Sequence, residues 1–162
     1  MPVDMTVIIG GEAGQGIQTV GNLVARCCPS AGLYPLAVND FESRIRGGHS
    51  FIKVRIADRP IHAPHHRIQL LIAMDEQTYP LHRDELSEDG VVILGTENDR
   101  VVDRAVTIAF EDLAREAGGR IVANTVAAGA GLAKLGAPES LLDGQLQSLF
   151  EHRAKDVLDV NL

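Results

Sequence analysis

Tryptophan is absent from this sequence of 162 residues, and tyrosine and phenylalanine together occur only six times. Proteins that bind single-stranded nucleic acid use aromatic side chains as stacking platforms, and this chain offers few of them. Positive charge is scarce as well, because 15 Lys and Arg residues stand against 22 Asp and Glu residues and the net charge is −7. A nucleic-acid-binding surface is usually basic. We therefore expect no nucleic-acid partner.

Cysteine occurs only at Cys27 and Cys28. Adjacent cysteines are poorly placed for an ordinary disulfide, and two thiols are too few for an iron–sulfur cluster or a structural zinc site. Hydrophobic runs are short, the best being residues 70–74, whereas a membrane-spanning helix needs roughly 18 apolar residues. Residues 1–4 lack the basic flank of a signal peptide. We expect a reduced, cytoplasmic protein without a membrane span or its own metal, whose cysteines are small core residues.

The composition that remains, 45% hydrophobic and 23% charged, is typical of a globular chain. Short β-branched runs alternate with segments in which apolar residues recur at helical spacing. This alternation predicts one three-layer, Rossmann-like α/β domain over residues 1–162, with a mostly parallel sheet. Residues 51–56 alternate charged and apolar side chains, which favours a half-exposed strand in an antiparallel hairpin. We expect strands at 5–9, 33–38, 51–56, 68–73, 91–94 and 107–110, and helices at 17–28, near Pro80, at 110–116, at 125–135 after an Asn124 N-cap, and at 139–162.

Basic residues are concentrated in one part of this acidic chain. Residues 44–67 contain six Arg and Lys residues against the single acid Asp58, and four of the six histidines. Such an island is a candidate site for a small anion or an acidic partner, although a hairpin with basic outward residues would give the same pattern. His62, His65 and His66 have no companion carboxylate at metal-ligand spacing, so we do not expect zinc there.

A glycine-rich stretch, residues 10–16 (GGEAGQG), lies between the first predicted strand and the first predicted helix. Glycines permit a tight turn and close approach of a phosphate, and a helix N-terminus directs backbone N–H groups at an anion. A nucleotide-hydrolase loop needs Lys and Ser or Thr next, but Ile17 and Gln18 follow. The dinucleotide fingerprint needs a third glycine where Thr19 stands. The loop is therefore either an anion site of another kind or a tight structural turn.

Three stretches, in order along the chain, resemble the gamma domain or subunit of the 2-oxoacid:ferredoxin (or acceptor) oxidoreductases of pyruvate or 2-oxoglutarate type. The first is the glycine loop with the residue after it, 10–17 (GGEAGQGI). The second is residues 41–50 (FESRIRGGHS), and it is more specific than the first. The third is residues 124–126 (NTV) and the small-residue helix after them. Together they span nearly the whole chain.

The resemblance implies an accessory part of a thiamine-diphosphate-dependent enzyme that oxidatively decarboxylates a 2-oxo acid to an acyl-coenzyme A, with ferredoxin as electron acceptor. It implies that alpha, beta and possibly delta domains or subunits hold thiamine diphosphate, Mg and iron–sulfur clusters. The gamma domain would pack on these partners, help to bind coenzyme A and close the active site, and would be inactive alone. The second motif resembles chains in which gamma and alpha are fused, so we expect the N-terminal part of such a chain.

The same resemblance assigns residues. We expect the diphosphate or pantetheine arm of coenzyme A to lie on the glycine loop and on an amide contact from the third motif, because phosphate oxygens accept hydrogen bonds from such groups. The cofactor-binding residues would be Gly11, Glu12, Gly14, Gln15, Gly16 and Asn124. A bend at the second motif would carry Arg46, His49 or Ser50 to the substrate carboxylate or the cofactor in a neighbouring subunit. An interface ion pair is the alternative for Arg46, and an orienting hydrogen bond for His49.

Two other functions stay open. The chain would also suit a free-standing Rossmann-like module that binds a nucleotide or a coenzyme A thioester. An independent NAD-dependent oxidoreductase ranks last, because the third fingerprint glycine and a substrate domain are missing. Association with a partner that carries thiamine diphosphate would separate the oxidoreductase subunit from the free-standing module.

Overall fold

A computed structural model describes residues 3–41, 48–95, 102, 104–119 and 122–150 of the chain. Its centre is a six-stranded sheet in the order β2-β3-β1-β4-β5-β6. The strands are β1 (Asp4–Glu12), β2 (Tyr34–Phe41), β3 (His49–Ala57), β4 (Ile68–Ala73), β5 (Leu86–Leu94) and β6 (Ala105–Thr107). The helices are α1 (Ile17–Ser30), α2 (Thr78–His82), the short 3-10 helix η1 (Arg83–Glu85), α3 (Phe110–Glu116), α4 (Ala123–Lys134) and α5 (Glu139–Phe150).

The sheet combines parallel and antiparallel pairing, as predicted. Strands β1, β4, β5 and β6 pair in parallel, whereas β3 runs antiparallel to both of its neighbours, β1 and β2. Because of this reversal, β3 begins at the edge where β1 ends, and His49 is the register partner of Glu12. The alternation in residues 51–56 reflects this inserted strand, in which Ile52, Val54 and Ile56 are buried.

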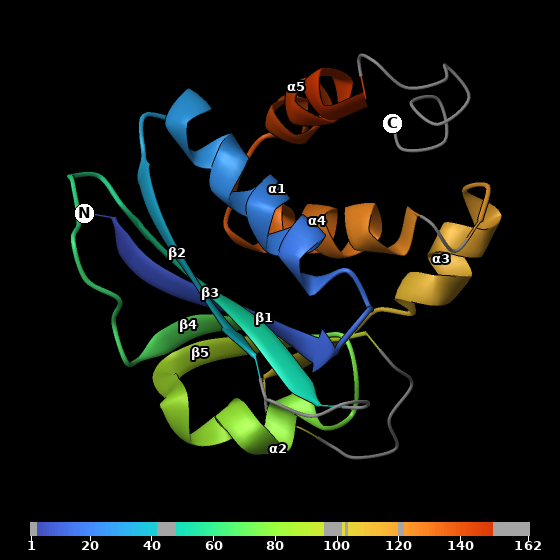
Figure 1. The fold of residues 1–162 in the computed structure, drawn as a ribbon, viewed down its shortest axis with the longest axis horizontal. Helices are drawn as coiled ribbons and strands as arrows, with labels where there is room; N and C mark the ends of the chain where they lie inside the picture. Colours follow the sequence, from blue (N-terminus) through green and yellow to red (C-terminus); the bar gives the residue numbers. More distant parts are fainter. Residues whose placement is uncertain (1–2, 42–47, 96–101, 103, 120–121, 151–162) are drawn as a thin grey trace.

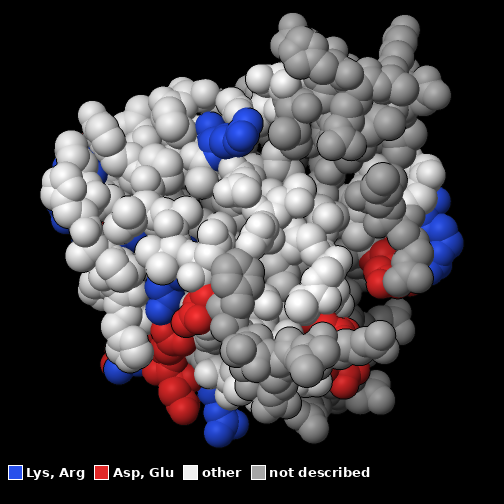
Figure 2. All heavy atoms as spheres, viewed as in Figure 1, with Lys and Arg blue, Asp and Glu red and all other residues white. Residues whose placement is uncertain are grey.

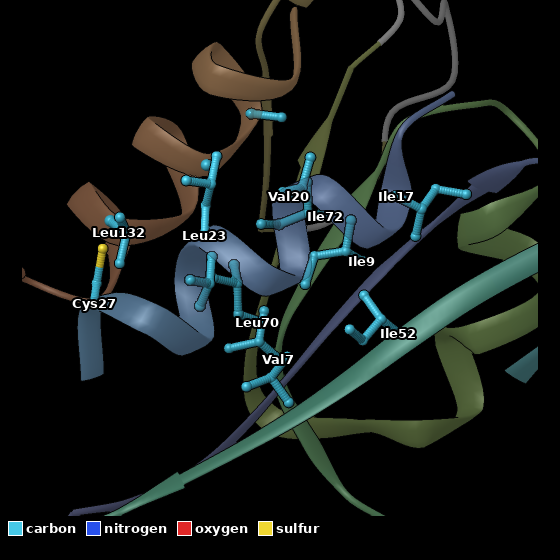
Figure 3. Packing of buried hydrophobic residues seen from close by; sticks show 14 of the residues in the cluster. Val7, Ile9, Ile17, Val20, Leu23, Cys27, Ile52, Leu70, Ile72 and Leu132 are labelled. Atoms are coloured by element: carbon cyan, nitrogen blue, oxygen red, sulfur yellow. The ribbon is translucent and has the colours of Figure 1, made fainter. Parts of the chain in front are cut away.

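Helices cover the two faces of the sheet unequally (Figure 1). α1, α4 and α5 lie over one face, and the short α2 lies on the opposite face. The larger apolar cluster fills the space under α1 and α4, where Val7, Ile9 and Ile72 of the sheet meet Leu23 of α1 and Leu132 of α4 (Figure 3). A smaller cluster around Ile8 and Leu71 lies on the α2 face. The predicted three-layer arrangement is therefore confirmed, with one thick and one thin helical layer.

Both cysteines lie on the buried side of α1, as the sequence predicts. Cys27 is 1% exposed and Cys28 is 5% exposed. Burial raises the pKa of the Cys27 thiol, and it raises the pKa of Cys28 to about 11. The Cys28 thiol donates a hydrogen bond to the Val24 carbonyl at 3.2 Å. The two side chains therefore act as small apolar residues of the core.

Several boundaries differ from the sequence-based expectations. α1 runs through Pro29 and ends one residue later, because a proline in the last turn disturbs little and Gly32 (φ 72°) ends the helix. β5 begins five residues earlier than predicted, because Leu86 pairs with Ile68 and the register then shifts, so that Leu70 pairs with Val91. β6 lies at 105–107 rather than 107–110. For α5, the predicted part beyond residue 150 lies outside the described residues.

No helix in the part of the chain that the structure describes is both long enough and apolar enough to cross a bilayer. Over the same described residues, His, Cys, Asp and Glu side chains form no group of three or more that could hold a metal ion.

Candidate functional site

The glycine loop turns between β1 and α1 on two residues with positive φ, Gly14 (99°) and Gly16 (80°). Its shape is held by Gln15, whose N–H donates to the Glu12 carbonyl at 3.1 Å and whose side-chain Oε1 accepts from the Glu12 N–H at 2.8 Å. The Ala13 N–H donates to the Gly48 carbonyl at 3.3 Å, which ties the loop to the residue before β3. The Gln15 side chain, predicted to contact a ligand, is thus turned back onto its own loop.

The start of α1 leaves backbone donors available. The Gly16 carbonyl accepts from the N–H groups of Thr19 and Val20, which closes the first turn. Among the described residues, no hydrogen bond is made by the N–H groups of Gly14, Gly16, Ile17 or Gln18. Unpaired amides at a helix N-terminus, together with the helix dipole, attract a phosphate or carboxylate.

Asn124, from the third motif, meets this loop directly. A Cβ added to Gly16 would collide with the Asn124 side-chain amide, so only glycine at position 16 lets that side chain lie where it does. The predicted N-cap role of Asn124 is wrong: α4 is capped by Val122 without a side-chain hydrogen bond. The Asn124 side chain instead lies against the glycine loop. The fold therefore brings together two of the predicted cofactor-binding segments, which are more than a hundred residues apart in sequence.

A cavity of about 810 Å³ opens beside this contact. It lies at the carboxyl ends of the parallel strands, where open α/β sheets bind their ligands. β1, β4 and β5 lead into it, and α3 and α4 begin at it. Its lining residues are Glu12, Gly14, Gln15, Met74, Asp75, Glu76, Gly95, Ala109, Phe110, Glu111, Asp112, Ala123 and Asn124. A volume of this size suits a ligand larger than a single phosphate ion.

Among the residues that the structure describes, the charged side chains lining the cavity are all acidic. Asp75 is held by Thr78, whose N–H and hydroxyl donate to Oδ1 at 2.9 and 2.7 Å. Asp112 forms an ion pair with Arg115 at 2.6 Å. Glu12, Glu76 and Glu111 complete the acidic set. An anionic group of a ligand would therefore be attracted by the loop amides and repelled by these carboxylates.

Two cations of the basic island, Arg55 and Arg59, lie away from the glycine loop, whereas Arg44 and Arg46 lie outside the described residues. Arg55 bonds both oxygens of Asp4 at 2.9 Å, and Arg59 bonds Asp4 at 2.7 Å. The hydrogen bond from Arg55, together with the positive charges of Arg55 and Arg59, lowers the pKa of Asp4. Asp4 begins β1, so the cluster lies at the end of the sheet away from the loop. The face seen in Figure 2 accordingly has small mixed groups of acidic and basic side chains rather than one basic patch.

His49 and Ser50 belong to a strand rather than to a projecting bend. They are the first residues of β3, so their side chains point to opposite faces of the sheet. Ser50 is 7% exposed and faces the α1 side, whereas His49 contacts His82 at the end of α2. Arg46 lies outside the described residues. The predicted substrate-facing roles of these residues stay predictions.

The structure adds two residues that the sequence did not single out. His49 Nε2 lies 2.8 Å from Nε2 of His82, and Nδ1 of His82 lies 2.7 Å from Oε1 of Glu85. The other carboxylate oxygen of Glu85 accepts from Lys53 Nζ at 2.7 Å. The only local signal was the spacing of His82 and Glu85, three residues apart, which is common on helix surfaces. Their link to His49 spans 33 residues and needed the fold to be seen.

Comparison with known proteins gives a consistent result. The family model described as "Pyruvate ferredoxin/flavodoxin oxidoreductase" matches residues 6–162. The 2-oxoglutarate synthase subunit KorC of Methanocaldococcus jannaschii is 31% identical over 134 residues, covering 75% of this chain and 70% of that protein. The 2-oxoacid:ferredoxin oxidoreductase subunit alpha of a Sulfolobus species is 33% identical over 75 residues, but the match covers only 12% of that longer protein.

Solved structures agree on the fold. Pyruvate oxidoreductase subunit PORC from Thermotoga maritima gives a TM-score of 0.81 at 24% identity, covering 98% of this chain and 90% of that one. The 2-oxoglutarate:ferredoxin oxidoreductase from Magnetococcus marinus, solved with 2-oxoglutarate, coenzyme A and succinyl-CoA bound, gives a TM-score of 0.84 at 24% identity. That match covers 98% of this chain and 29% of the other. Relatives thus include separate subunits of similar length and much longer chains.

Proposed function

Since this chain belongs to the pyruvate ferredoxin/flavodoxin oxidoreductase family, we propose that it is the gamma part of a 2-oxoacid:ferredoxin oxidoreductase and binds coenzyme A for that enzyme. In this proposal, alpha and beta parts, with or without a delta part, hold thiamine diphosphate, Mg and the iron–sulfur clusters and carry out the decarboxylation and electron transfer to ferredoxin. The two buried cysteines of this chain are unsuited to cluster ligation, in keeping with that division of labour.

The observation that carries the proposal is the set of amides at Gly14, Gly16, Ile17 and Gln18 that bond no described residue, with the Asn124 amide packed beside Gly16. Coenzyme A presents a diphosphate, and phosphate oxygens accept hydrogen bonds from such donors. In the Magnetococcus marinus protein, which has the same fold, coenzyme A is bound. We place the diphosphate at the glycine loop for these reasons.

The acidic wall of the cavity has a complementary role in this proposal. Carboxylates repel phosphate but accept hydrogen bonds from hydroxyl and amide N–H groups, which coenzyme A carries on its ribose and its pantetheine arm. Glu12 and Glu76 would therefore orient the ligand, with its phosphates on the loop and its neutral donors toward the acids. The wall would also exclude ligands that consist of phosphate alone.

Gly14→Ala tests the coenzyme A site, with Gly32→Ala as its matched control. Gly14→Ala adds no clash, since nothing lies within 4 Å of the new Cβ, but it disfavours φ of 99° and displaces the loop amides. Gly32→Ala places the same strain at φ 72°, also in open space, at the far end of α1. In the assembled oxidoreductase, calorimetric titration with coenzyme A is expected to show roughly tenfold weaker binding for Gly14→Ala. Gly32→Ala is expected to bind normally.

Asn124→Ala extends the test without backbone strain, because alanine is favoured inside α4. Loss of one amide contact to a phosphate is expected to weaken binding about fivefold to tenfold. Gln147→Ala, on the exposed side of α5, is the control for a helical amide. Unchanged coenzyme A affinity in both Gly14→Ala and Asn124→Ala complexes would refute the site. Purification of the chain without any thiamine-diphosphate-carrying partner would favour the free-standing binding module instead.

A further inference from the structure

The face of the sheet opposite α1 holds a hydrogen-bonded chain of four ionisable side chains, His49–His82–Glu85–Lys53. We propose that His82 and Glu85 are positioning residues for His49, fixing its ring and tuning its proton uptake at the coenzyme A-binding end of the sheet. The functional part of this inference rests on the proposed function, because it assumes that His49 serves the active site of the assembled oxidoreductase.

The polar atoms of the chain can be assigned in only one way when both imidazoles are neutral. Glu85 is an acceptor as a carboxylate, so His82 donates to it from Nδ1–H. The neutral His82 then has its lone pair on Nε2, and His49 must donate to it from Nε2–H. The bond from His49 to His82 and the bond from His82 to Glu85 therefore fix the tautomer and the orientation of both rings.

Packing holds the two imidazole rings of the hydrogen-bonded chain in place. His82 is 4% exposed, and the edge of its ring meets Phe51 at a centroid distance of 4.6 Å and an interplanar angle of 73°. His49 stacks beside Phe51 at 5.9 Å and 27°. Phe51 itself packs on the apolar cluster of this face. The two imidazoles therefore have little freedom to leave their hydrogen bonds, which is what a positioning role needs.

The hydrogen-bonded side chains also contact the glycine loop, through His49. A Cβ added to Gly10, two residues before Glu12, would stand 3.0 Å from Cε1 of His49 and 2.7 Å from Cγ2 of Thr78. Thr78 begins α2 and is bonded to Asp75, which lines the cavity. The His49 ring thus lies against the backbone that leads into the loop, so its orientation and charge act on the site through direct contact.

Charge around the imidazoles is balanced by two opposed groups. Burial alone would raise the pKa of Glu85, but the hydrogen bonds from Lys53 and His82 outweigh it and lower that pKa. Lys53 neutralises the carboxylate from β3, and the exposed His66 ring lies 3.8 Å from the same carboxylate. Among the described residues, the other charged groups on the neighbouring elements are Asp4 and Glu12 in β1, Asp40 in β2, Arg55 in β3, Asp75 and Glu76 before α2, Arg83 and Asp84 in η1, and Arg67 before β4.

Two substitutions of similar size should move the proton affinity of the histidine pair in opposite directions. Glu85→Gln keeps an oxygen acceptor for His82 but removes the negative charge, so the pair should take up its proton at lower pH. Lys53→Met keeps the chain length but removes the positive charge, so uptake should occur at higher pH. Each midpoint is expected to move by about half a pH unit or more. Any nearby charge acts on a histidine in this way, so these shifts test the electrostatic coupling and the pH profile of activity tests the role.

The first measurement uses the whole polypeptide and is independent of coenzyme A. The Cε1–H resonances of His49 and His82 are followed by NMR against pH, with His62, which lies in an exposed loop, as the reference. Opposite shifts in the two variants support the tuning. Shifts of the same sign, or none, overturn it. If Glu85→Gln fails to fold, the upward shift in Lys53→Met still decides the matter.

The second measurement tests the role of the pair in the enzyme. In the assembled oxidoreductase, the acid limb of kcat/KM against pH is expected to move down in Glu85→Gln and up in Lys53→Met. An unmoved limb, with the NMR shifts as expected, overturns the positioning role. Because coenzyme A affinity is measured separately with the Gly14 and Asn124 variants, failure here leaves the binding site standing, and failure there leaves the NMR result standing.

Discussion

The two faces of the sheet are built on different principles. Under α1 and α4 the sheet presents branched aliphatic side chains, and small residues of the helices let the backbones approach closely, as at Gly21 against Ile52 and Gly131 against Ile72. Under α2 the apolar cluster is smaller, and a buried polar chain ends on His49. The first face supplies non-directional burial, whereas the second depends on exact partners. Most of the apolar burial that stabilises the domain therefore lies on the α1 face, and the hydrogen-bonded ionisable side chains lie on the α2 face.

The largest expected loss of stability comes from a substitution on the α1 face. Leu23 of α1 is 2% exposed among the aliphatic residues of the larger cluster. Leu23→Ala is expected to lower the free energy of unfolding by about 2–5 kcal/mol, through lost burial and the cavity left behind. Leu81→Ala, on the thin side at 57% exposure, is expected to change it by less than about 0.5 kcal/mol. Urea unfolding of both variants measures the contrast, and equal losses would abolish it.

A smaller, pH-dependent loss of stability is expected from a substitution in the hydrogen-bonded side chains of the α2 face. Glu85→Gln is expected to cost roughly 1–3 kcal/mol of stability at pH 7, because charge-assisted hydrogen bonds to Lys53 and His82 are weakened. Since the pKa of Glu85 is lowered by folding, this contribution is present above its unfolded pKa of about 4.3 and is lost as pH falls through the folded value. Unfolding measured across this range should show the two proteins converging in acid. A gap that stays constant with pH would contradict the assignment.

The smallest expected change in stability tests the close packing of α1 against β3. A Cβ at Gly21 would crowd the side chain of Ile52, whereas a Cβ at Gly144 on α5 meets nothing within 4 Å. Gly21→Ala is expected to cost about 1 kcal/mol, because crowding outweighs the gain in helix propensity. Gly144→Ala is expected to stabilise the domain by about 0.5–1 kcal/mol. Thermal unfolding of the pair gives the comparison, and stabilisation by both would show that α1 can move away from β3.

The fold could be predicted from sequence where periodicity and glycine placement agreed. β1, β3, β4 and α1 follow directly from their apolar patterns, and the loop between β1 and α1 follows from its glycines. The start of β5 was missed, because Glu88 and Asp89 give no strand pattern and the strand is extended by the pairing of Leu86 with Ile68 in β4. This difference arises where tertiary pairing overrides local preference.

The candidate site was predictable in part for the same reason. The glycine loop and Asn124 carry recognisable local patterns, and the fold brings them together. His82 and Glu85 carry none, because their meaning comes from contact with a strand about thirty residues earlier. The pairing of Arg55 and Arg59 with Asp4 could not be predicted either, since charge counted along the chain does not reveal partners more than fifty residues away.

The reversed course of β3 has an evolutionary consequence. β2 pairs with β3 from Tyr34 and Ala57 to Phe41 and Ser50, and β3 pairs with β1 as far as His49 and Glu12. These pairs set the register of the three strands without any contribution from the residues that join β2 to β3. Evolution can therefore exchange the joining residues without resetting the sheet.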